Sequence, residues 1–266
     1  MGRRRLDTEL VRRGLASSPG EAEAAVLEGR VTVSGRPAEK PSTLVAPADP
    51  VELVRPSRRF VSRGGDKLDA ALDRFGLDVT GRECLDAGAS TGGFTDCLLQ
   101  RGAARVVSVD VGYGQLAWSL RSDERVSVLE RTNVRDLRPE HLPATPSVVV
   151  ADLSFMSLRA AVPVLAGLAA DRADLVLLVK PQFEVAPGDV GHGGVVRDPE
   201  LWRCAIEDTA AACTAAGLGP REVMASPLTG PAGNVEFLLH AVKGTPEIGL
   251  DLNAALAEGR AAAGSS

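Results

Sequence analysis

Two charged residues follow apolar runs in a way that suggests acid–base chemistry. Asp152 comes after residues 147–151, and Lys180 comes after residues 175–179. If both runs are strands of a parallel sheet, both side chains lie at its carboxyl edge, where open α/β folds bind ligands. A lysine buried beside a second cation can accept a proton near neutral pH. We therefore predict that Lys180 takes part in proton transfer; the alternative is a structural ion pair.

Two further charged residues belong with this set. Glu236 is flanked by apolar residues in a predicted last strand over residues 235–242, so it needs a partner if it is buried. Lys67 lies at the start of a helix that we expect to open at Asp66, where a cation opposes the helix dipole. A lysine placed against local preference suggests a specific role, and simple exposure is the alternative.

A glycine-containing turn adds a binding element to these charges. Residues 83–99 contain an apolar run that ends at Asp86, then small residues, then an amphipathic pattern, which is typical of a strand, a tight turn and a helix. Glycines 88, 92 and 93 would let backbone N–H groups approach an anion at the helix N-terminus. Ser90 replaces the second glycine of the dinucleotide motif, and no Lys-Ser/Thr pair follows. A carboxylate-bearing ligand such as S-adenosylmethionine (SAM) therefore fits better than a phosphate; an ordinary tight turn is the alternative.

A second carboxylate supports a nucleoside-binding fold. Asp110 ends a buried strand at 106–110, and it lies 22 residues past Gly88. That spacing is near the ~20 residues that separate the glycine turn from the acidic residue on a ribose in dinucleotide-type folds. Two matched features indicate such a fold more strongly than either one alone.

The elements that must hold these residues alternate between strand and helix from residue 66 to 243. We predict strands over residues 83–86, 106–110, 126–129, 147–152, 175–180 and 235–242, with helices opening at 66 and 93 and lying near 115–121, 157–169 and 200–216. This pattern is typical of a parallel α/β sheet with right-handed crossovers. Residues 244–266 are expected to be a flexible tail without a helix.

The first 54 residues read as a small α+β unit of their own. Leu6, Leu10 and Leu15 give a short helical stripe, and residues 18–21 combine an N-cap serine, a proline at N1 and a glutamate at N3. Alternating valines at 31 and 33 and a run at 51–54 predict short strands. Residues 55–65 are rich in Pro, Ser and Gly and are expected to link the two domains.

Composition excludes several classes of protein. The four cysteines lack C-x-x-C spacing and only three histidines are present, so we expect neither a zinc site nor disulfides, and no metal cofactor. No apolar run approaches a bilayer span, and no signal-peptide core is visible, so we expect a cytoplasmic protein without membrane insertion. Residues 1–63 carry twelve Lys/Arg and eight Asp/Glu, a net +4, which leaves −9 for the remainder. The basic head suggests a polyanionic partner, or a solvated basic face.

The head resembles the S4 RNA-binding domain. The resemblance rests on Arg5-Leu6-Asp7 and on residues 11–16, 28–35 and 40–42 (Val-Arg-Arg-Gly-Leu-Ala, Glu-Gly-Arg-Val-Thr-Val-Ser-Gly and Lys-Pro-Ser). It implies that basic residues contact folded RNA. The residues so nominated are Arg3, Arg4, Arg5, Arg12, Arg13, Arg30 and Lys40. Ser17 and Pro19 stand where related sequences often carry arginine, so phosphate contact by the second helix is in question.

The body resembles FtsJ-like ribose 2′-O-methyltransferases, whose K-D-K-E set has the chain order of Lys67, Asp152, Lys180 and Glu236. With the S4-like head, residues 3–243 are similar to the TlyA (hemolysin A) family. Further matching motifs are residues 86–95 (Asp-Ala-Gly-Ala-Ser-Thr-Gly-Gly-Phe-Thr), 153–155 (Leu-Ser-Phe), 180–184 (Lys-Pro-Gln-Phe-Glu) and 193–197 (Gly-Gly-Val-Val-Arg). The resemblance implies a Rossmann-like, mostly parallel seven-stranded sheet that uses SAM to methylate cytidine 2′-hydroxyls in ribosomal RNA, with ribosomal subunits as partners.

Roles for the candidate residues follow from that chemistry. A ribose hydroxyl is a weak nucleophile, so we predict Lys180 as the base that removes its proton. Lys67 and Lys180 would stabilise the developing alkoxide, while Asp152 and Glu236 would orient the two amines. The methionine part of SAM is assigned to Asp86, Gly88, Ser90, Gly92, Gly93 and Phe94. Asp110 is assigned to the ribose, and Asn133 with Val134 to the adenine.

Three other functions stay open on sequence alone. The methyltransferase fold could be inactive and serve only to dock on RNA. The hemolysin name suggests membrane lysis, but charges at 171, 172 and 174 interrupt the most apolar region, and no strongly basic amphipathic helix is visible. S4 units also occur on pseudouridine synthases, to which the turn after Asp86 and the Asp110 carboxylate do not belong. The oligomeric state and the modified nucleotide cannot be inferred.

Overall fold

The computed structural model describes residues 2–16, 18–27, 29–54 and 59–264. The chain divides into two compact units, Met1–Arg58 and Arg59–Ser266. Ser17 and residues 55–58 of the predicted linker lie outside the described residues. Each unit has its own core, and each is described by itself.

The N-terminal unit is built from short elements. They are β1 (Arg4–Arg5), α1 (Leu6–Arg12), α2 (Pro19–Leu27), β2 (Val31–Val33), β3 (Arg36–Pro37), β4 (Leu44–Val45) and β5 (Val51–Leu53). Leu6 and Leu10, one helical turn apart, are fully buried because they share a face of α1. The predicted start of α2 is confirmed, since the Glu21 N–H donates to the Ser18 hydroxyl at 3.2 Å. β2 pairs antiparallel with both β3 and β5.

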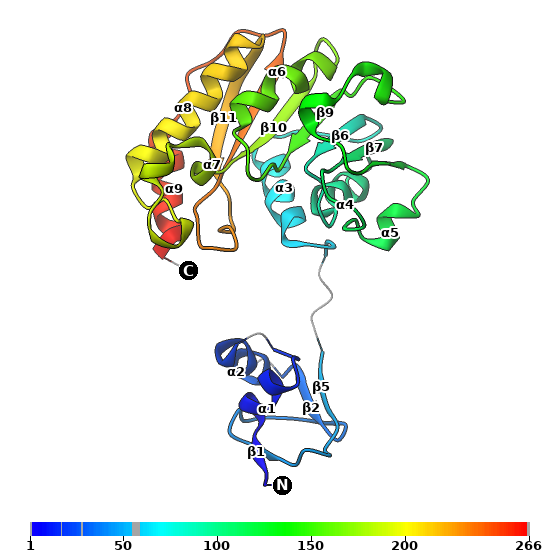
Figure 1. The fold of residues 1–266 in the computed structure, drawn as a ribbon, viewed down its shortest axis with the longest axis vertical. Coiled ribbons are helices and arrows are strands. Elements are labelled where there is room, and N and C mark those ends of the chain that lie inside the picture. The colour runs from blue at the N-terminus through cyan, green and yellow to red at the C-terminus, as the bar shows by residue number, and fades with distance from the viewer. Residues whose placement is uncertain (1, 17, 28, 55–58, 265–266) are drawn as a thin grey trace. The chain divides into compact units, whose positions relative to one another are not determined.

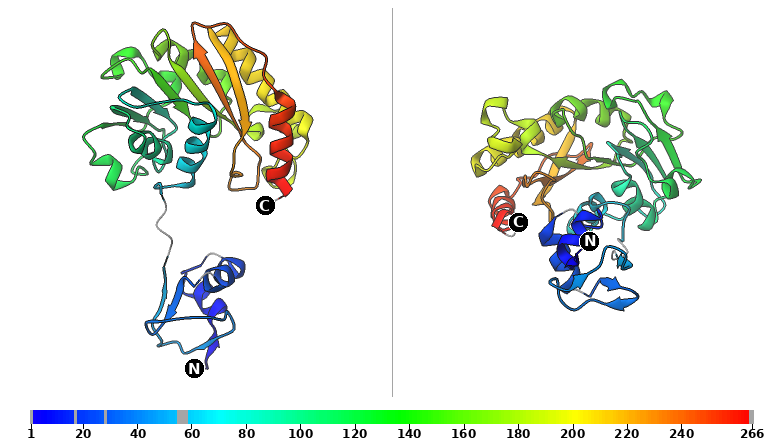
Figure 2. Two further views of the ribbon diagram at one scale, coloured as in Figure 1. Left: turned by 180° about the vertical axis from the view of Figure 1, so that it is seen from behind. Right: turned by 60° about the horizontal axis from the view of Figure 1, so that its bottom comes forward.

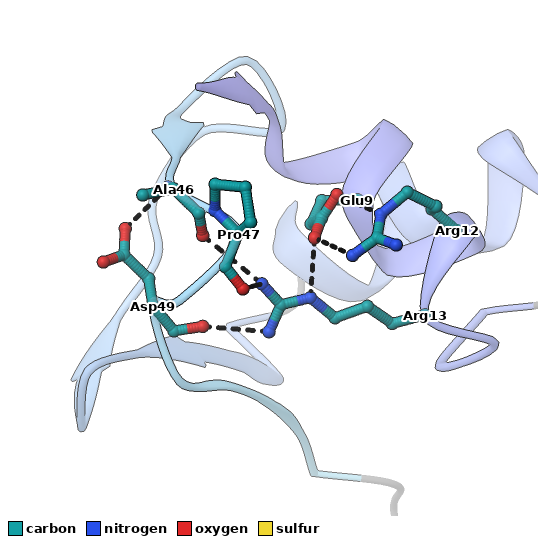
Figure 3. A network of polar contacts seen from close by, with 6 residues as sticks. All are labelled: Glu9, Arg12, Arg13, Ala46, Pro47 and Asp49. Atoms are coloured by element: carbon teal, nitrogen blue, oxygen red, sulfur yellow. Dashed lines mark hydrogen bonds and ion pairs between the residues drawn. The ribbon is translucent and has the colours of Figure 1, made fainter. Parts of the chain in front are cut away.

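A buried carboxylate, that of Glu9, is part of a network of polar contacts in this unit (Figure 3). Glu9 is 1% exposed, and its oxygens accept from the Arg12 guanidinium at 2.6 Å and from Arg13 Nε at 2.8 Å. These hydrogen bonds hold the pKa of the Glu9 carboxyl at about 2. The same Arg13 guanidinium donates to the carbonyls of Asp49 at 2.9 Å and Pro47 at 3.1 Å. Arg13 thus joins α1 to the segment before β5.

The C-terminal unit is a sheet with helices on both faces, as the sequence predicts. Its elements are α3 (Arg63–Arg74), β6 (Glu83–Ala87), α4 (Gly93–Gln100), β7 (Arg105–Val109), α5 (Trp118–Arg121), β8 (Val126–Leu129), β9 (Val148–Ala151), α6 (Leu158–Leu168), β10 (Asp174–Val179), α7 (Pro181–Glu184), α8 (Pro199–Ala215), β11 (Leu218–Ala225), β12 (Phe237–Lys243) and α9 (Leu252–Gly264). Within residues 59–264, seven strands pair in the order β11-β12-β10-β9-β6-β7-β8. Strands β10, β9, β6, β7 and β8 run parallel, and β12 is antiparallel to both of its neighbours. The predicted fold class is confirmed.

Alternate residues of the central strands enter different cores. Leu85 and Ala87 of β6 pack with residues of α6 and α8, whereas Cys84 packs with residues of α3 and α4. This alternation follows from the two-residue period of a strand, and it explains why these strands are apolar throughout. Figure 1 shows the helices arranged about the sheet.

The prediction of a flexible tail without a helix was wrong. α9 lies beside β11 (Figure 2, left), and it buries Ala255 and Leu256 in the core that α6 and α8 share. Gly259 approaches Phe237 so closely that a Cβ there would lie 3.1 Å from the ring. The alanine-rich composition is that of a good helix former, and packing supplies the stability that an isolated helix would lack. β11 was also missed, because Gly219 and Pro220 interrupt its strand pattern.

The helix at the start of this unit begins earlier than predicted. α3 starts at Arg63, inside the predicted linker, and Ser62 caps it by accepting from the Gly64 N–H at 3.3 Å. Phe60 is 2% exposed and packs against Gly65, where any Cβ would overlap its ring. Lys67 is therefore past the first turn of α3, so the helix dipole does not explain its placement.

Candidate active site

The four charged residues nominated from sequence form two ion pairs. Lys180 Nζ lies 2.6 Å from Asp152 Oδ1, and it also donates to the Ser154 hydroxyl at 2.9 Å. Lys67 Nζ pairs with Glu236 Oε2. Lys67 is 7% exposed and Glu236 is 2% exposed, so the alternative of an exposed lysine is excluded. Each buried cation thus has its own carboxylate, as buried charges require.

Strand register explains how distant residues meet here. β10 and β12 pair antiparallel, and the last matched residues are Val179 and Phe237. Lys180 and Glu236 are each one residue beyond that pair, so they lie at adjacent strand ends. Glu236 immediately precedes β12, where the sequence had placed it inside the strand. Asp152 follows β9, the parallel neighbour of β10 on its other side.

A cavity of about 350 Å³ opens at this carboxyl edge. Its lining includes five of the nine residues assigned to the cofactor and one of the four assigned to catalysis. These are Gly88, Ser90, Asp110, Asn133 and Val134, with Asp152. Gly88 has φ +88°, and a Cβ at this position would lie 2.4 Å from the Asp152 carbonyl oxygen. Glycine is therefore required for the turn to pass so close to the strand that carries the catalytic candidate.

The Asp110 carboxylate is held at the wall of the cavity by backbone donors. Its Oδ2 accepts from the Ser90 N–H at 2.8 Å, and its Oδ1 accepts from the Gly112 N–H at 2.6 Å. Ser90 itself adopts φ +49°, a left-handed conformation that glycine adopts more easily. The carboxylate follows β7 at the carboxyl edge of the sheet, where open α/β folds bind ligands, and its assignment to a ribose stays a prediction.

The other cofactor candidates lie beneath the turn and are not among the residues that line this cavity. Asp86 is fully buried and accepts from the Thr95 hydroxyl at 2.6 Å. Burial raises the pKa of the Asp86 carboxyl to about 7. Gly92, with φ +97°, packs against leucines of the following segment, while Gly93 packs against Ser62 and Phe94 is 3% exposed. In this structure these residues shape the turn, and the assignment of direct contact stays a prediction.

The structure adds cavity residues to which the sequence assigned no role. Residues 153–156 form one wall of the cavity, and Gln115 lines another. The hydroxyl of Ser154 contacts the Lys180 amine. Ser154 belongs to the Leu-Ser-Phe motif and lies two residues after Asp152. Its closeness to an acidic residue at a strand end could have indicated a place in the site. Gln115 carries no such signal, because its segment folds back to the turn through tertiary contacts.

The basic residues of the N-terminal unit have two kinds of surroundings. Arg12 and Arg13 bind Glu9, and Arg5 binds Asp7 at 2.5 Å, so these side chains have partners within the unit. Of the remaining candidates, Arg4 lies on β1, and Arg3, Arg30 and Lys40 lie outside helices and strands; Arg3, Arg4 and Lys40 are exposed, and Arg30 is half-buried. Contact with RNA is not decided by these positions and stays a prediction.

The arrangement is suited to proton removal beside a bound nucleoside. The Lys180 amine contacts a carboxylate and a hydroxyl that both line the cavity, and the same cavity is lined by the glycine turn and Asp110. Among the described residues, no group of His, Cys, Asp and Glu is arranged to hold a metal ion. None of the described helices is both long and apolar enough to cross a bilayer.

Family models match nearly the whole chain. The model of the FtsJ-like methyltransferases matches residues 60–243, and the model of the S4 domain matches residues 4–51.

Individual relatives match over similar lengths. A protein of Mycobacterium tuberculosis named 16S/23S rRNA (cytidine-2′-O)-methyltransferase TlyA is 55% identical over 238 residues, which is 89% of each chain. A protein of Brachyspira hyodysenteriae named hemolysin A is 37% identical over 239 residues, 90% of this chain and 99% of its own. A solved structure of a candidate hemolysin from Streptococcus thermophilus superposes with a TM-score of 0.77 at 34% identity, and it covers 100% of this chain and 98% of its own.

Proposed function

Because the chain belongs to the TlyA family of FtsJ-like methyltransferases with an S4 domain, we propose that it transfers a methyl group from SAM to the 2′-hydroxyl of a cytidine in ribosomal RNA. The substrate is taken from the names of relatives, which call the Mycobacterium tuberculosis protein a 16S/23S rRNA methyltransferase and one from Campylobacter jejuni a 23S rRNA methyltransferase. A ribosomal substrate implies action in the cytoplasm.

The cavity supports SAM as the cofactor. The backbone N–H groups of the turn around Gly88 and Ser90 would bind its carboxylate, and Asp110 would accept from its ribose hydroxyls. Asn133 and Val134 line the same cavity and would border the adenine. The bound cofactor supplies a methyl group on a positively charged sulfur, so the protein itself needs only to position and deprotonate the acceptor.

Lys180 is better placed than Lys67 to be the general base. Lys180 is not itself among the lining residues, but both of its partners, Asp152 and Ser154, line the cavity, whereas neither Lys67 nor its partner Glu236 does. The 2′-hydroxyl must lose its proton as its oxygen attacks the methyl carbon, and a neutral Lys180 amine would take that proton. Asp152 would then stabilise the ammonium that forms, and Lys67 would balance Glu236 nearby.

The N-terminal unit supports an RNA substrate. Its S4 match predicts RNA binding, and Arg3, Arg4 and Lys40 are exposed on it, in a region of net positive charge. Phosphate contacts of this kind supply affinity that falls as salt concentration rises. We therefore propose that this unit delivers ribosomal RNA, or an assembled subunit, to the methyltransferase unit.

The observation that carries the proposal is the ion pair between Lys180 and Asp152, which lines the cavity, and Lys180→Ala tests it. Tritiated methyl transfer to ribosomal RNA should fall by about 10²- to 10⁴-fold, the usual contribution of a general base. Lys243→Ala is the matched control. Lys243 is the last residue of β12 and lies at the end of that strand away from Glu236, where its amine donates to the Ala169 carbonyl at 2.7 Å. That variant should keep its activity.

Other outcomes would select a different function. Transfer by Lys180→Ala at the wild-type rate would refute the role of Lys180. A wild-type chain that binds ribosomal RNA but transfers no methyl group would support an inactive docking protein. Mapping 2′-O-methyl groups in cells with and without the protein would identify the nucleotide and the subunit.

A further inference from the structure

Two segments that border the site contact each other from one end to the other. One is the loop of residues 152–157 between β9 and α6, and the other is residues 180–184, which begin at Lys180 and include α7. Their first contacts are those of Lys180 with Asp152 and Ser154. Next, the rings of Phe155 and Phe183 meet with their centroids 5.4 Å apart. The last contacts are made by Glu184.

Glu184 closes this set of contacts with a buried carboxylate. The residue is 4% exposed, and its Oε1 accepts from the Leu158 N–H at 2.7 Å while its Oε2 accepts from the Ser157 hydroxyl. Ser157 is the N-cap of α6 and Leu158 is its first residue. The carboxylate therefore satisfies free donors at a helix start, where a negative charge is favoured. In this way α7 fixes where the loop ends and α6 begins.

The loop needs such a restraint. Phe155 adopts φ +62°, a conformation that is strained for a non-glycine residue of this size and persists only where the surroundings impose it. The residue is 92% exposed, so burial does not hold it in this conformation. Residues 152–156 also form a wall of the cofactor cavity. A loop that relaxed would move Ser154 away from the Lys180 amine.

We propose that Glu184 is a positioning residue, which holds the loop of residues 152–157 so that Ser154 and Asp152 keep the Lys180 amine in one orientation. The catalytic importance of that orientation rests on the proposed function. The restraint of the loop by Glu184 does not, because the stability of the loop can be measured without any substrate.

The first experiment measures amide hydrogen exchange in the full chain for Glu184→Ala, Glu184→Gln and Asp208→Ala. Loss of a charge-assisted hydrogen bond should speed exchange in residues 153–159 by about 10- to 100-fold in Glu184→Ala. Glu184→Gln keeps an acceptor oxygen for Leu158 and should change exchange by only about threefold. Asp208→Ala is the control for the contribution of Arg159, because Arg159 contacts both Asp208 at 3.1 Å and Glu184 at 3.7 Å. Exchange in this variant should stay close to that of wild type. Unchanged exchange in Glu184→Ala would overturn the proposal.

The second experiment measures kcat for methyl transfer in a double-mutant cycle with Ser154→Ala. If Glu184 acts through Ser154, Glu184→Ala should lower kcat by about 10- to 100-fold, and adding Ser154→Ala should lower it little further. Glu184→Gln should recover most of the rate. Independent losses that multiply, or equal losses for Gln and Ala, would show that Glu184 acts only on stability and would overturn the proposal. A wild-type chain without methyl transfer would refute the proposed function, and exchange would still decide whether Glu184 holds the loop.

Discussion

Asp86 should make the C-terminal unit less stable as pH rises, and replacing it with asparagine should remove that dependence. The side chain is fully buried, and its Oδ1 has no hydrogen-bond partner among the described residues. Burial is the largest cause that raises its pKa to about 7 from 3.8, and the nearby Asp152 and Asp110 charges add to it, while the Thr95 hydrogen bond opposes it.

The sign and size follow from proton linkage. The folded state binds this proton more tightly than the unfolded state, so the stabilisation is fully present below pH 3.8 and is lost as pH rises through about 7. At 1.36 kcal/mol for each pKa unit, the full loss is about 4 kcal/mol, and the part between pH 5 and pH 8 is about 2–3 kcal/mol. Asp86→Asn cannot ionise. The free energy of unfolding of wild type, relative to that of the variant, should therefore fall by this amount between the two pH values.

The measurement is urea unfolding at pH 5 and pH 8, followed by tryptophan fluorescence. Both tryptophans, Trp118 and Trp202, belong to the C-terminal unit, so the signal reports on the unit that contains Asp86. An unpaired amide in the variant would change the variant's free energy of unfolding by the same amount at both pH values. It would therefore not alter the predicted change in relative stability between pH 5 and pH 8. Wild type and variant curves that stay parallel from pH 5 to pH 8 would refute the reasoning.

Three further predictions concern the ion pairs, the N-terminal unit and the last helix. Lys67→Met leaves Glu236 buried without its cation, so urea unfolding should show a loss of about 3–5 kcal/mol, and Lys67→Met with Glu236→Gln should recover most of it. Arg13→Ala removes a contact to Glu9 and contacts to backbone carbonyls, so amide exchange should accelerate throughout residues 2–54, whereas Arg3→Ala should leave exchange unchanged; equal effects would contradict the structural role of Arg13. A chain that ends before Leu252 should expose the α9 side of the core and lower the melting temperature by several degrees, and an unchanged temperature would support the flexible tail that the sequence suggested.

The fold and the catalytic candidates were predictable because they depend on local pattern. Apolar runs that end in Asp110, Asp152 and Lys180 specify buried parallel strands, and strands of that kind bring their carboxyl ends to one edge. The pairing of Lys67 with Glu236 was less accessible, since it depends on α3 packing beside the end of β12, 169 residues away in sequence. Sequence spacing could nominate both residues but could not say which carboxylate each lysine would take.

The errors arose where tertiary packing overrides local preference. Residues 252–264 read as a small-residue tail because their apolar face is made largely of alanines, and only the surface beneath α9 shows that they are buried. The assignment of Gly92, Gly93 and Phe94 to the cofactor is a different case, because it stays a prediction: the structure shows only that their protein neighbours include Leu120, Ser62 and Gly64. A glycine needed for close approach looks the same in sequence whether the approaching group is a ligand or a protein side chain.

The two ion pairs divide the charges of the site in a way that suits its proposed chemistry. Lys180 lies next to Glu236 across the strand ends, yet its amine turns to Asp152, and this leaves Glu236 to Lys67. Two ammonium groups near each other would repel both one another and the positive sulfur of a bound cofactor, and two paired carboxylates cancel that repulsion. The partner of Lys180 has a side chain that is 25% exposed, whereas Glu236 is 2% exposed. The Lys180–Asp152 pair is thus the more accessible of the two, which is why removing Lys180 should slow the proposed reaction and removing Lys67 should first destabilise the fold.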